Sequence, residues 1–169
     1  MRIRAAALLL TLALPLTGCG LKPLYGGGAS GPVAQSLRSI EVRPIGGRAG
    51  WLVRTALEDR LGSGGGAKRY RLEVELDDQI IGFGVRADDA ETRERRTLRA
   101  RYRLVEQDKG TVVLDATAGS DVGIDVVSSE YAVVAAEQTA LDRLSKEIAD
   151  QIVTRLALFA SRGGGAAGQ

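Results

Sequence analysis

The chain lacks histidine and contains a single cysteine, Cys19, among its 169 residues. One cysteine cannot form an intramolecular disulfide, and a structural zinc site needs several soft ligands that this chain does not have. Without histidine there is no imidazole to act as a general base or as a metal ligand. Aromatic residues make up only 4% of the sequence, too few for the stacking platforms that bind single-stranded nucleic acid. These absences disfavour most enzyme classes and nucleic-acid binding, and no cofactor is expected.

The lone cysteine directly follows an apolar run near the start of the chain. Two arginines precede this run, AAALLLTLALPL over residues 5–16, which is too short to span a membrane and has the layout of a bacterial secretory signal. The tetrad LTGC, residues 16–19, resembles the lipobox of bacterial lipoproteins, in which the cysteine is acylated and the peptide before it is removed. An ordinary secreted protein with an unused thiol is the alternative. We therefore predict a signal peptide over residues 1–18 and lipid anchoring at Cys19.

Processing at this site would change the charge of the protein. The full chain has 23 Lys+Arg and 21 Asp+Glu, and loss of residues 1–18 removes Arg2 and Arg4, which leaves 21 of each sign. A neutral mature chain does not attract nucleic acid by long-range electrostatics. Gly20 follows the cysteine, in place of the aspartate that resembles an inner-membrane retention signal in enteric bacteria. The expected location is therefore the periplasmic side of the outer membrane.

The mature part divides into a tether, one domain and a tail. Residues 19–36 are rich in glycine, serine and proline and have no hydrophobic period, which predicts a lipidated tether. Residues 37–161 are enough for a single domain with its own core. The glycine-rich residues 162–169 are expected to form a disordered tail.

Hydrophobic periodicity predicts the element order strand, helix, three strands, helix. The expected elements are a short strand around Ile40 and Val42, a helix over residues 49–61, strands over 68–81, 97–106 and 111–127, and a last helix over 130–160. A helical crossover makes the first two strands parallel, and short turns make the last three a meander. The predicted fold is therefore α+β: a two-layer sandwich with a mixed four-stranded sheet and both helices on one face. Glycines in the last strand predict a β-bulge at Gly119 or Gly123.

Two motifs resemble ligand sites but lack the necessary context. GFGVRA over residues 82–87 matches a dinucleotide fingerprint, yet the charged stretch after it offers no packed helix to hold a pyrophosphate. The carboxylate pairs at residues 77–78 and 88–89 have no further ligands at regular spacing, and adjacent residues of a strand point to opposite faces. We expect these to be a hairpin loop and solubilising residues, and no metal site.

Arginines of the second hairpin form the most distinctive charge pattern. Between residues 86 and 103 stand four acids and seven arginines: Arg86, Arg93, Arg95, Arg96, Arg99, Arg101 and Arg103. Guanidinium groups bind phosphate bidentately, so the cluster would suit an anionic, phosphorylated amphiphile. Alternatively, the arginines pair with Glu73 and Glu75 on the neighbouring strand and form a solvated sheet face. The sequence pattern alone favours neither interpretation over the other.

Taken together, these features resemble one family. The segment GCGLKPLYG after a lipoprotein signal, the order of elements, the arginine-rich hairpin and a last helix that begins SSEYAVVAAEQTALDRL are similar to the LptE family of lipopolysaccharide-assembly lipoproteins, in its alphaproteobacterial form. The resemblance covers essentially the whole mature chain. It implies a non-enzymatic protein that plugs the lumen of a large outer-membrane β-barrel, helps it to insert lipopolysaccharide into the outer leaflet, and binds lipopolysaccharide itself.

The resemblance also implies where lipopolysaccharide would bind. The family's contacts lie in the loop between the second and third strands and near the start of the last helix, and the first region corresponds here to Arg86, Arg93, Arg95 and Arg96. The second region does not transfer, because YAVVAAEQ over residues 131–138 has no basic residue. The competing interpretations are a stand-alone outer-membrane lipoprotein that binds a lipid or another envelope component, and an envelope enzyme, which the lack of histidine and of a free thiol disfavours.

Overall fold

The computed structural model describes residues 30–62, 66–85 and 91–163. In chain order these form helix α2 (Pro32–Arg38), strand β1 (Ile40–Val42), helix α3 (Gly47–Leu61), strands β2 (Tyr70–Val85), β3 (Glu91–Glu106) and β4 (Val112–Asp125), and helix α4 (Glu130–Gly163). The predicted order of strands and long helices is confirmed. The expected signal peptide, Cys19 and Arg86 lie outside the described residues.

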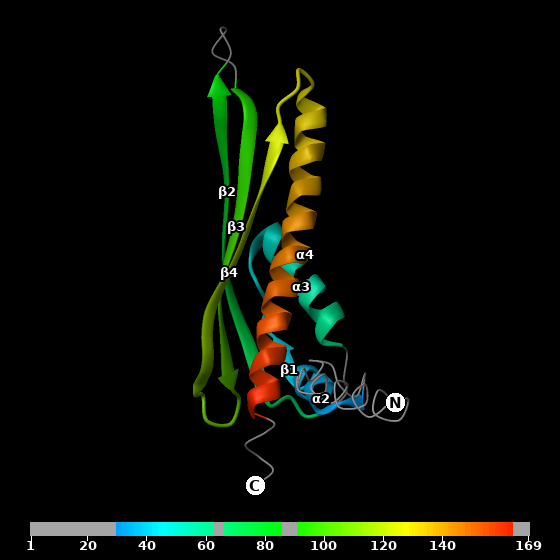
Figure 1. Ribbon diagram of the computed structural model, residues 1–169, viewed down its shortest axis with the longest axis vertical. Coiled ribbons are helices and arrows are strands. Elements are labelled where there is room, and N and C mark those ends of the chain that lie inside the picture. Colours follow the sequence, from blue (N-terminus) through cyan, green and yellow to red (C-terminus); the bar gives the residue numbers. More distant parts are fainter. Residues whose placement is uncertain (1–29, 63–65, 86–90, 164–169) are drawn as a thin grey trace, which may run out of the picture.

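The four strands form one open sheet in the order β1-β2-β3-β4. β1 runs parallel to the start of β2, and β2, β3 and β4 are antiparallel neighbours, as the crossover helix and the short turns predict. β2 and β3 are 16 residues long, whereas β1 covers only three positions of β2. Figure 1 shows the resulting long, strongly twisted sheet with α3 and α4 on the same side of it. This confirms the α+β two-layer architecture.

The core lies between the sheet and the helices. In β3, the even-numbered residues from Leu98 to Leu104 are at most 2% exposed, while the intervening positions carry arginines. α4 presents the opposing apolar stripe at three- and four-residue spacing, and the stripe consists of Leu141, Leu144, Ile148, Ile152 and Leu156. α3 adds Val53 and Leu57, both fully buried. One face of the sheet therefore packs against the helices. The other, here called the open face, carries the arginines that alternate with these buried residues of β3.

Helix α2 was not predicted from the sequence. Its first five residues, 32–36, lie in the stretch that the sequence analysis assigned to the tether, and its last two lie in the predicted domain. Pro32 occupies its first turn, where the missing N–H costs no intrahelical hydrogen bond, and Val33 and Leu37 are buried. Seven residues with two buried positions are too few to show a hydrophobic period, so only the tertiary packing identifies this helix.

The predicted bulge at Gly119 or Gly123 is wrong. Both glycines pair in register with arginines of β3, and the register shift lies instead between Leu104 and Val105, opposite the start of β4. Neither glycine has a positive φ, so neither backbone conformation requires glycine. The prediction failed because an interior glycine is also compatible with regular pairing, at a cost in conformational entropy alone.

A third glycine, Gly50 in α3, is required by close packing. A Cβ at this position would lie 2.5 Å from the carbonyl oxygen of Ile45, and a backbone atom cannot move aside as a side chain could. We expect Gly50→Ala to lower the free energy of unfolding by about 1–2 kcal/mol, the cost of overpacking. Urea unfolding monitored by circular dichroism would measure this. Gly123→Ala is the matched control because its Cβ would meet nothing within 4 Å; a similar loss in both variants would contradict the packing argument.

Two carboxylates of α4 bind neighbouring elements. Asp150 accepts hydrogen bonds from both Nε and Nη2 of Arg60 on α3, the latter at 3.1 Å. Glu147 accepts a 2.6 Å hydrogen bond from the Ser120 hydroxyl on β4 and a 2.8 Å bond from Arg143 of its own helix. The hydrogen bond from Arg60 lowers the pKa of Asp150, and those from Ser120 and then Arg143 lower the pKa of Glu147.

These lowered pKa values predict how stability depends on pH. A carboxyl group with a lower pKa in the folded state stabilises the fold above its unfolded pKa, about 4, and this contribution is lost as the pH falls through the folded pKa. Because the chain has no histidine, the free energy of unfolding should stay flat between about pH 6 and 7.5 and fall below about pH 4. Urea unfolding across this range tests the prediction, with Arg60→Gln expected to weaken the acid dependence. A decline already near neutral pH would contradict it.

Candidate functional site

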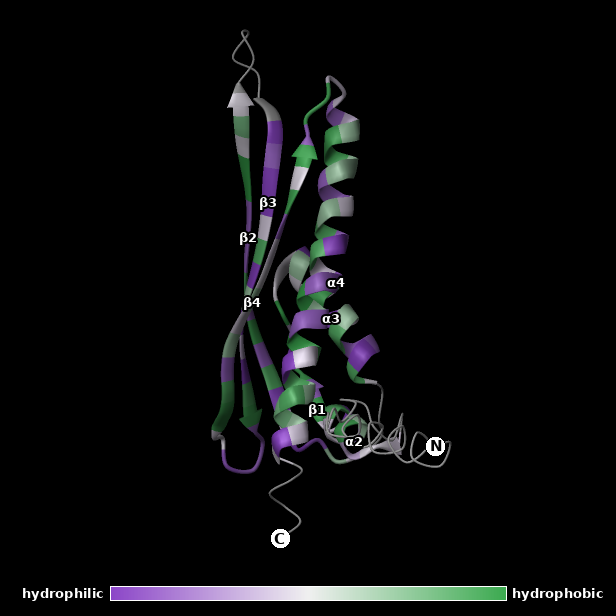
Figure 2. Cartoon of the chain, in the orientation of Figure 1, coloured by the Kyte–Doolittle hydropathy of each residue, from purple (hydrophilic) through white to green (hydrophobic). Residues whose placement is uncertain are grey.

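The described side chains that the sequence analysis singled out lie on β2 and β3, and some of them have partners on β4. Side chains alternate between the two faces of a strand, so the odd-numbered arginines of β3 point away from the core formed by Leu98 and its even-numbered neighbours. On this open face they form a central column with acids of β2 and β4 on either side. Figure 2 shows β3 as strongly hydrophilic toward the tip of the hairpin. The open face is therefore polar, as predicted.

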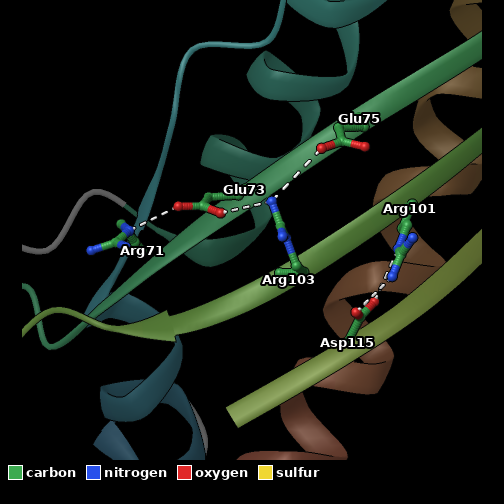
Figure 3. Close-up of polar contacts among 6 residues, drawn as sticks. All are labelled: Arg71, Glu73, Glu75, Arg101, Arg103 and Asp115. Carbon is green, nitrogen blue, oxygen red and sulfur yellow. Dashed lines mark hydrogen bonds and ion pairs between the residues drawn. The ribbon is translucent and has the colours of Figure 1, made fainter. Parts of the chain in front are cut away.

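In the lower half of this face the arginines are paired across strands. Arg103 lies between Glu73 and Glu75 of β2, with nitrogen–oxygen distances of 3.4 and 3.7 Å (Figure 3). Arg101 donates two hydrogen bonds to the carboxylate of Asp115 on β4, at 3.3 Å from Nε and 3.0 Å from Nη2. The hydrogen bond from Arg101 lowers the pKa of Asp115. Exposed pairs of this kind contribute little to stability because water and salt screen them, so their main effect is to balance the charge of the face.

Arg93 and Arg95 lie on the same open face near the tip of the hairpin. Arg93 forms an ion pair with Asp125 at 3.0 Å, and Arg95 one with Asp121 at 3.8 Å. The Arg95 guanidinium also lies 5.4 Å from the ring centre of Phe83, within cation–π range. Both arginine side chains remain about 60% exposed, at 61% and 59%. They are available to an external anion.

Arg96 lies on the opposite face, toward the helices. Its side chain is only 11% exposed and donates two hydrogen bonds to Asp78, at 2.8 and 2.6 Å, and a third at 2.8 Å to the carbonyl of Glu137 on α4. The hydrogen bonds with Asp78 raise the pKa of Arg96. The structure thus brings Arg93 and Arg95 together and separates Arg96 from them, and strand alternation alone was a sufficient signal for this separation.

Sequence reasoning missed the apolar side chains at the same end of the molecule. Ile81 and Phe83 are 59% and 39% exposed on the open face of β2. Val127, Tyr131 and Val134 are exposed where β4 leads into α4. The run IIGFGV was the available signal, because its apolar residues occupy both faces of a strand beyond the reach of the core. Arginines beside apolar groups form an amphipathic surface, which suits an anionic amphiphile.

Other kinds of site have little support in the described ranges. No group of three or more histidine, cysteine, aspartate or glutamate residues there is arranged to hold a metal ion. None of the helices over residues 30–62 and 91–163 is long and apolar enough to cross a bilayer.

Comparison with known proteins identifies relatives of this fold. The model of the LptE family, described as lipopolysaccharide-assembly, matches residues 37–156. A predicted lipoprotein from Caulobacter crescentus CB15 is 30% identical with a TM-score of 0.65, over 76% of this chain and 96% of that one. No curated protein shows significant sequence similarity.

Two more distant structures share the fold. The rare lipoprotein B from Shewanella oneidensis is 9% identical with a TM-score of 0.57, over 73% of this chain and 96% of that one. A minor lipoprotein from Acinetobacter baumannii is 13% identical with a TM-score of 0.53, over 70% of this chain and 90% of that one. At these identities the likeness concerns the fold alone.

Proposed function

The chain belongs to the LptE family of lipopolysaccharide-assembly lipoproteins, and from this premise we propose that it is a non-enzymatic outer-membrane lipoprotein that partners and plugs a lipopolysaccharide-translocating β-barrel. The observation that carries the proposal is the open sheet face. A barrel lumen is polar, so a plug needs an exterior that is hydrophilic without a large net charge. The cross-strand pairs of Arg103 and Arg101 with their acids provide such a face.

Cys19 would attach this domain to the membrane. In the proposal the signal peptide over residues 1–18 is removed and Cys19 carries acyl chains in the inner leaflet of the outer membrane. Each buried methylene contributes about 0.8 kcal/mol, and two or more chains give stable anchoring. Residues after the anchor would then give the domain its reach from the membrane to the barrel. Cys19→Ala should release the protein from the membrane fraction while leaving its fold unchanged.

Lipopolysaccharide is the proposed ligand of the amphipathic end of the hairpin. Arg93 and Arg95, with Arg86, which precedes them in the sequence, would contact its phosphates, and Ile81 and Phe83 its apolar part. Arg96 was proposed with them from the sequence, but its bonds to Asp78 and Glu137 favour a structural role. The proposed ligand contacts therefore centre on the open face.

Charge reversal tests this ligand site. We expect Arg93→Glu combined with Arg95→Glu to weaken lipopolysaccharide binding by roughly thirtyfold or more, since each of the two lost phosphate contacts costs about 1 kcal/mol or more. Binding of purified protein to immobilised lipopolysaccharide would measure the loss. The matched control reverses Arg101 and Arg103, which are equally basic and lie on the same strand further from the tip. Unchanged binding after reversal of Arg93 and Arg95 would remove these residues from the site.

Purification from the native outer membrane tests the partnership. The tagged protein is isolated in mild detergent, the co-purified proteins are identified, and lipopolysaccharide is assayed in the same eluate. We expect a large β-barrel in stoichiometric amount. Recovery of the lipoprotein alone, under conditions that keep other envelope complexes intact, would favour the alternative of a stand-alone outer-membrane lipoprotein that binds a lipid or another envelope component.

A further inference from the structure

In the described part of the open sheet face, one rung, meaning a row of directly paired residues across β2, β3 and β4, has an arginine without an ion pair. Four of the arginines on this face of β3, Arg93, Arg95, Arg101 and Arg103, have an acid within 4 Å. Arg99, in the middle of the column, has no such partner among the described residues. Asp77 is its direct cross-strand neighbour, but both Asp77 oxygens accept hydrogen bonds at 3.1 Å from the amide of Gln79. One cation and one carboxylate thus lie side by side without an ion pair between them.

The opposite neighbour of Arg99 leaves space beside it. This neighbour is Gly119 on β4, whose backbone N–H and C=O are both hydrogen-bonded to the side-chain amide of Gln151, at 3.2 and 3.1 Å. With no side chain on β4 at this rung, a hollow of about 530 Å³ remains, lined by Asp77, Arg99, Arg101, Thr117, Gly119 and Gln151. Figure 3 shows the next two arginines of this face, Arg101 and Arg103, which form ion pairs with acids of the neighbouring strands. An external group can therefore reach Arg99 directly.

We propose that this rung docks a segment of the barrel wall that carries an acid opposite Arg99 and a cationic side chain opposite Asp77. The inference rests on the proposed function and adds the face and the residues through which the two proteins meet. Both signs of charge are present in the hollow, so a wall segment with an acid and a base would complement it. A polyanionic lipid head group would instead place a phosphate next to Asp77, where like charges repel. The charge pattern thus favours a protein over lipopolysaccharide as the occupant.

Site-specific photo-crosslinking in cells tests the proposal. A photoreactive phenylalanine analogue replaces Thr117, which lines the hollow from β4, and crosslinked products are identified after illumination and purification. We expect a crosslink to the barrel. In the same background, Arg99→Glu should reduce the crosslink yield about tenfold, equivalent to about 1.4 kcal/mol of binding free energy. Arg99 is exposed and has no ion pair in the described part of the chain, so its reversal should not disturb folding, which thermal unfolding would verify.

Lys146→Glu is the matched control, because it makes the same charge change at an exposed position of α4 in the helix layer. Its crosslink yield should equal that of the unaltered protein. Three results would overturn the proposal: a crosslink from position 117 to lipopolysaccharide, an unchanged yield in Arg99→Glu, or no crosslink although the barrel still co-purifies. If no barrel co-purifies with the unaltered protein, the proposed function itself fails, and the docking site fails with it.

Discussion

Truncation of Leu144 to alanine is expected to lower the free energy of unfolding by about 3–5 kcal/mol. Leu144 is fully buried on α4 and belongs to the single core cluster between the sheet and the helices. The variant loses the transfer free energy of the removed methyl and methylene groups and leaves a cavity that the surrounding side chains fill only partly. Since single domains are stable by about 5–15 kcal/mol, one substitution would remove roughly a fifth or more of the total.

Urea unfolding followed by circular dichroism and by tryptophan fluorescence measures this loss. Val134→Ala is the matched control, because Val134 lies on the same helix with 48% of its surface exposed. Its substitution should change stability by less than about 0.5 kcal/mol, as alanine is the better helix former and little packing is lost. Equal effects of the two variants would show that the start and the middle of α4 are equally packed, contrary to their burial.

The contrast between these two positions also shows how far the sequence predicts the fold. The period of α4 marks Val134 and Leu144 alike as members of one apolar stripe, so periodicity predicted the helix correctly. It could not show which part of the stripe is buried, because that depends on where the shorter α3 and the twisted sheet end. α2 escaped prediction for a related reason: Val33 and Leu37 are apolar positions whose burial depends on elements distant in the sequence.

The candidate site was predictable to a similar degree. Composition located the arginines, and strand alternation would have assigned each one to a face. The acid with which each arginine pairs was not predictable. Arg103 forms ion pairs with Glu73 and Glu75, whereas Arg99 forms none with its direct neighbour Asp77. That outcome depends on a glycine in the adjacent strand and on the amide of Gln79, which holds Asp77. Pairings of this kind require the register of β2, β3 and β4 to be known to a single residue.

Substitution of Arg96 by alanine is expected to lower the free energy of unfolding by about 2–3 kcal/mol. The loss is smaller than for breaking a fully buried ion pair, because the side chain of its partner Asp78 is 24% exposed. The substitution removes two hydrogen bonds to Asp78 and one to the carbonyl of Glu137. It leaves the Asp78 carboxylate without its counter-charge and releases the upper part of α4 from the hairpin. Arg96→Lys should lose less, because an ammonium retains the charge but not the two-point contact.

Arg95→Ala is the matched control, with an exposed side chain and a single ion pair at 3.8 Å, and should cost less than about 1 kcal/mol. A double-mutant cycle with Asp78→Asn should give a coupling energy of about 1 kcal/mol or more between Arg96 and Asp78. A cycle without coupling would contradict the structural role of Arg96.

If the role is structural, the Arg96 variant should lose lipopolysaccharide binding only in proportion to its unfolded fraction. Reversal of Arg93 and Arg95 should reduce binding while the protein remains fully folded, so measuring stability and binding together separates the fold from the ligand site.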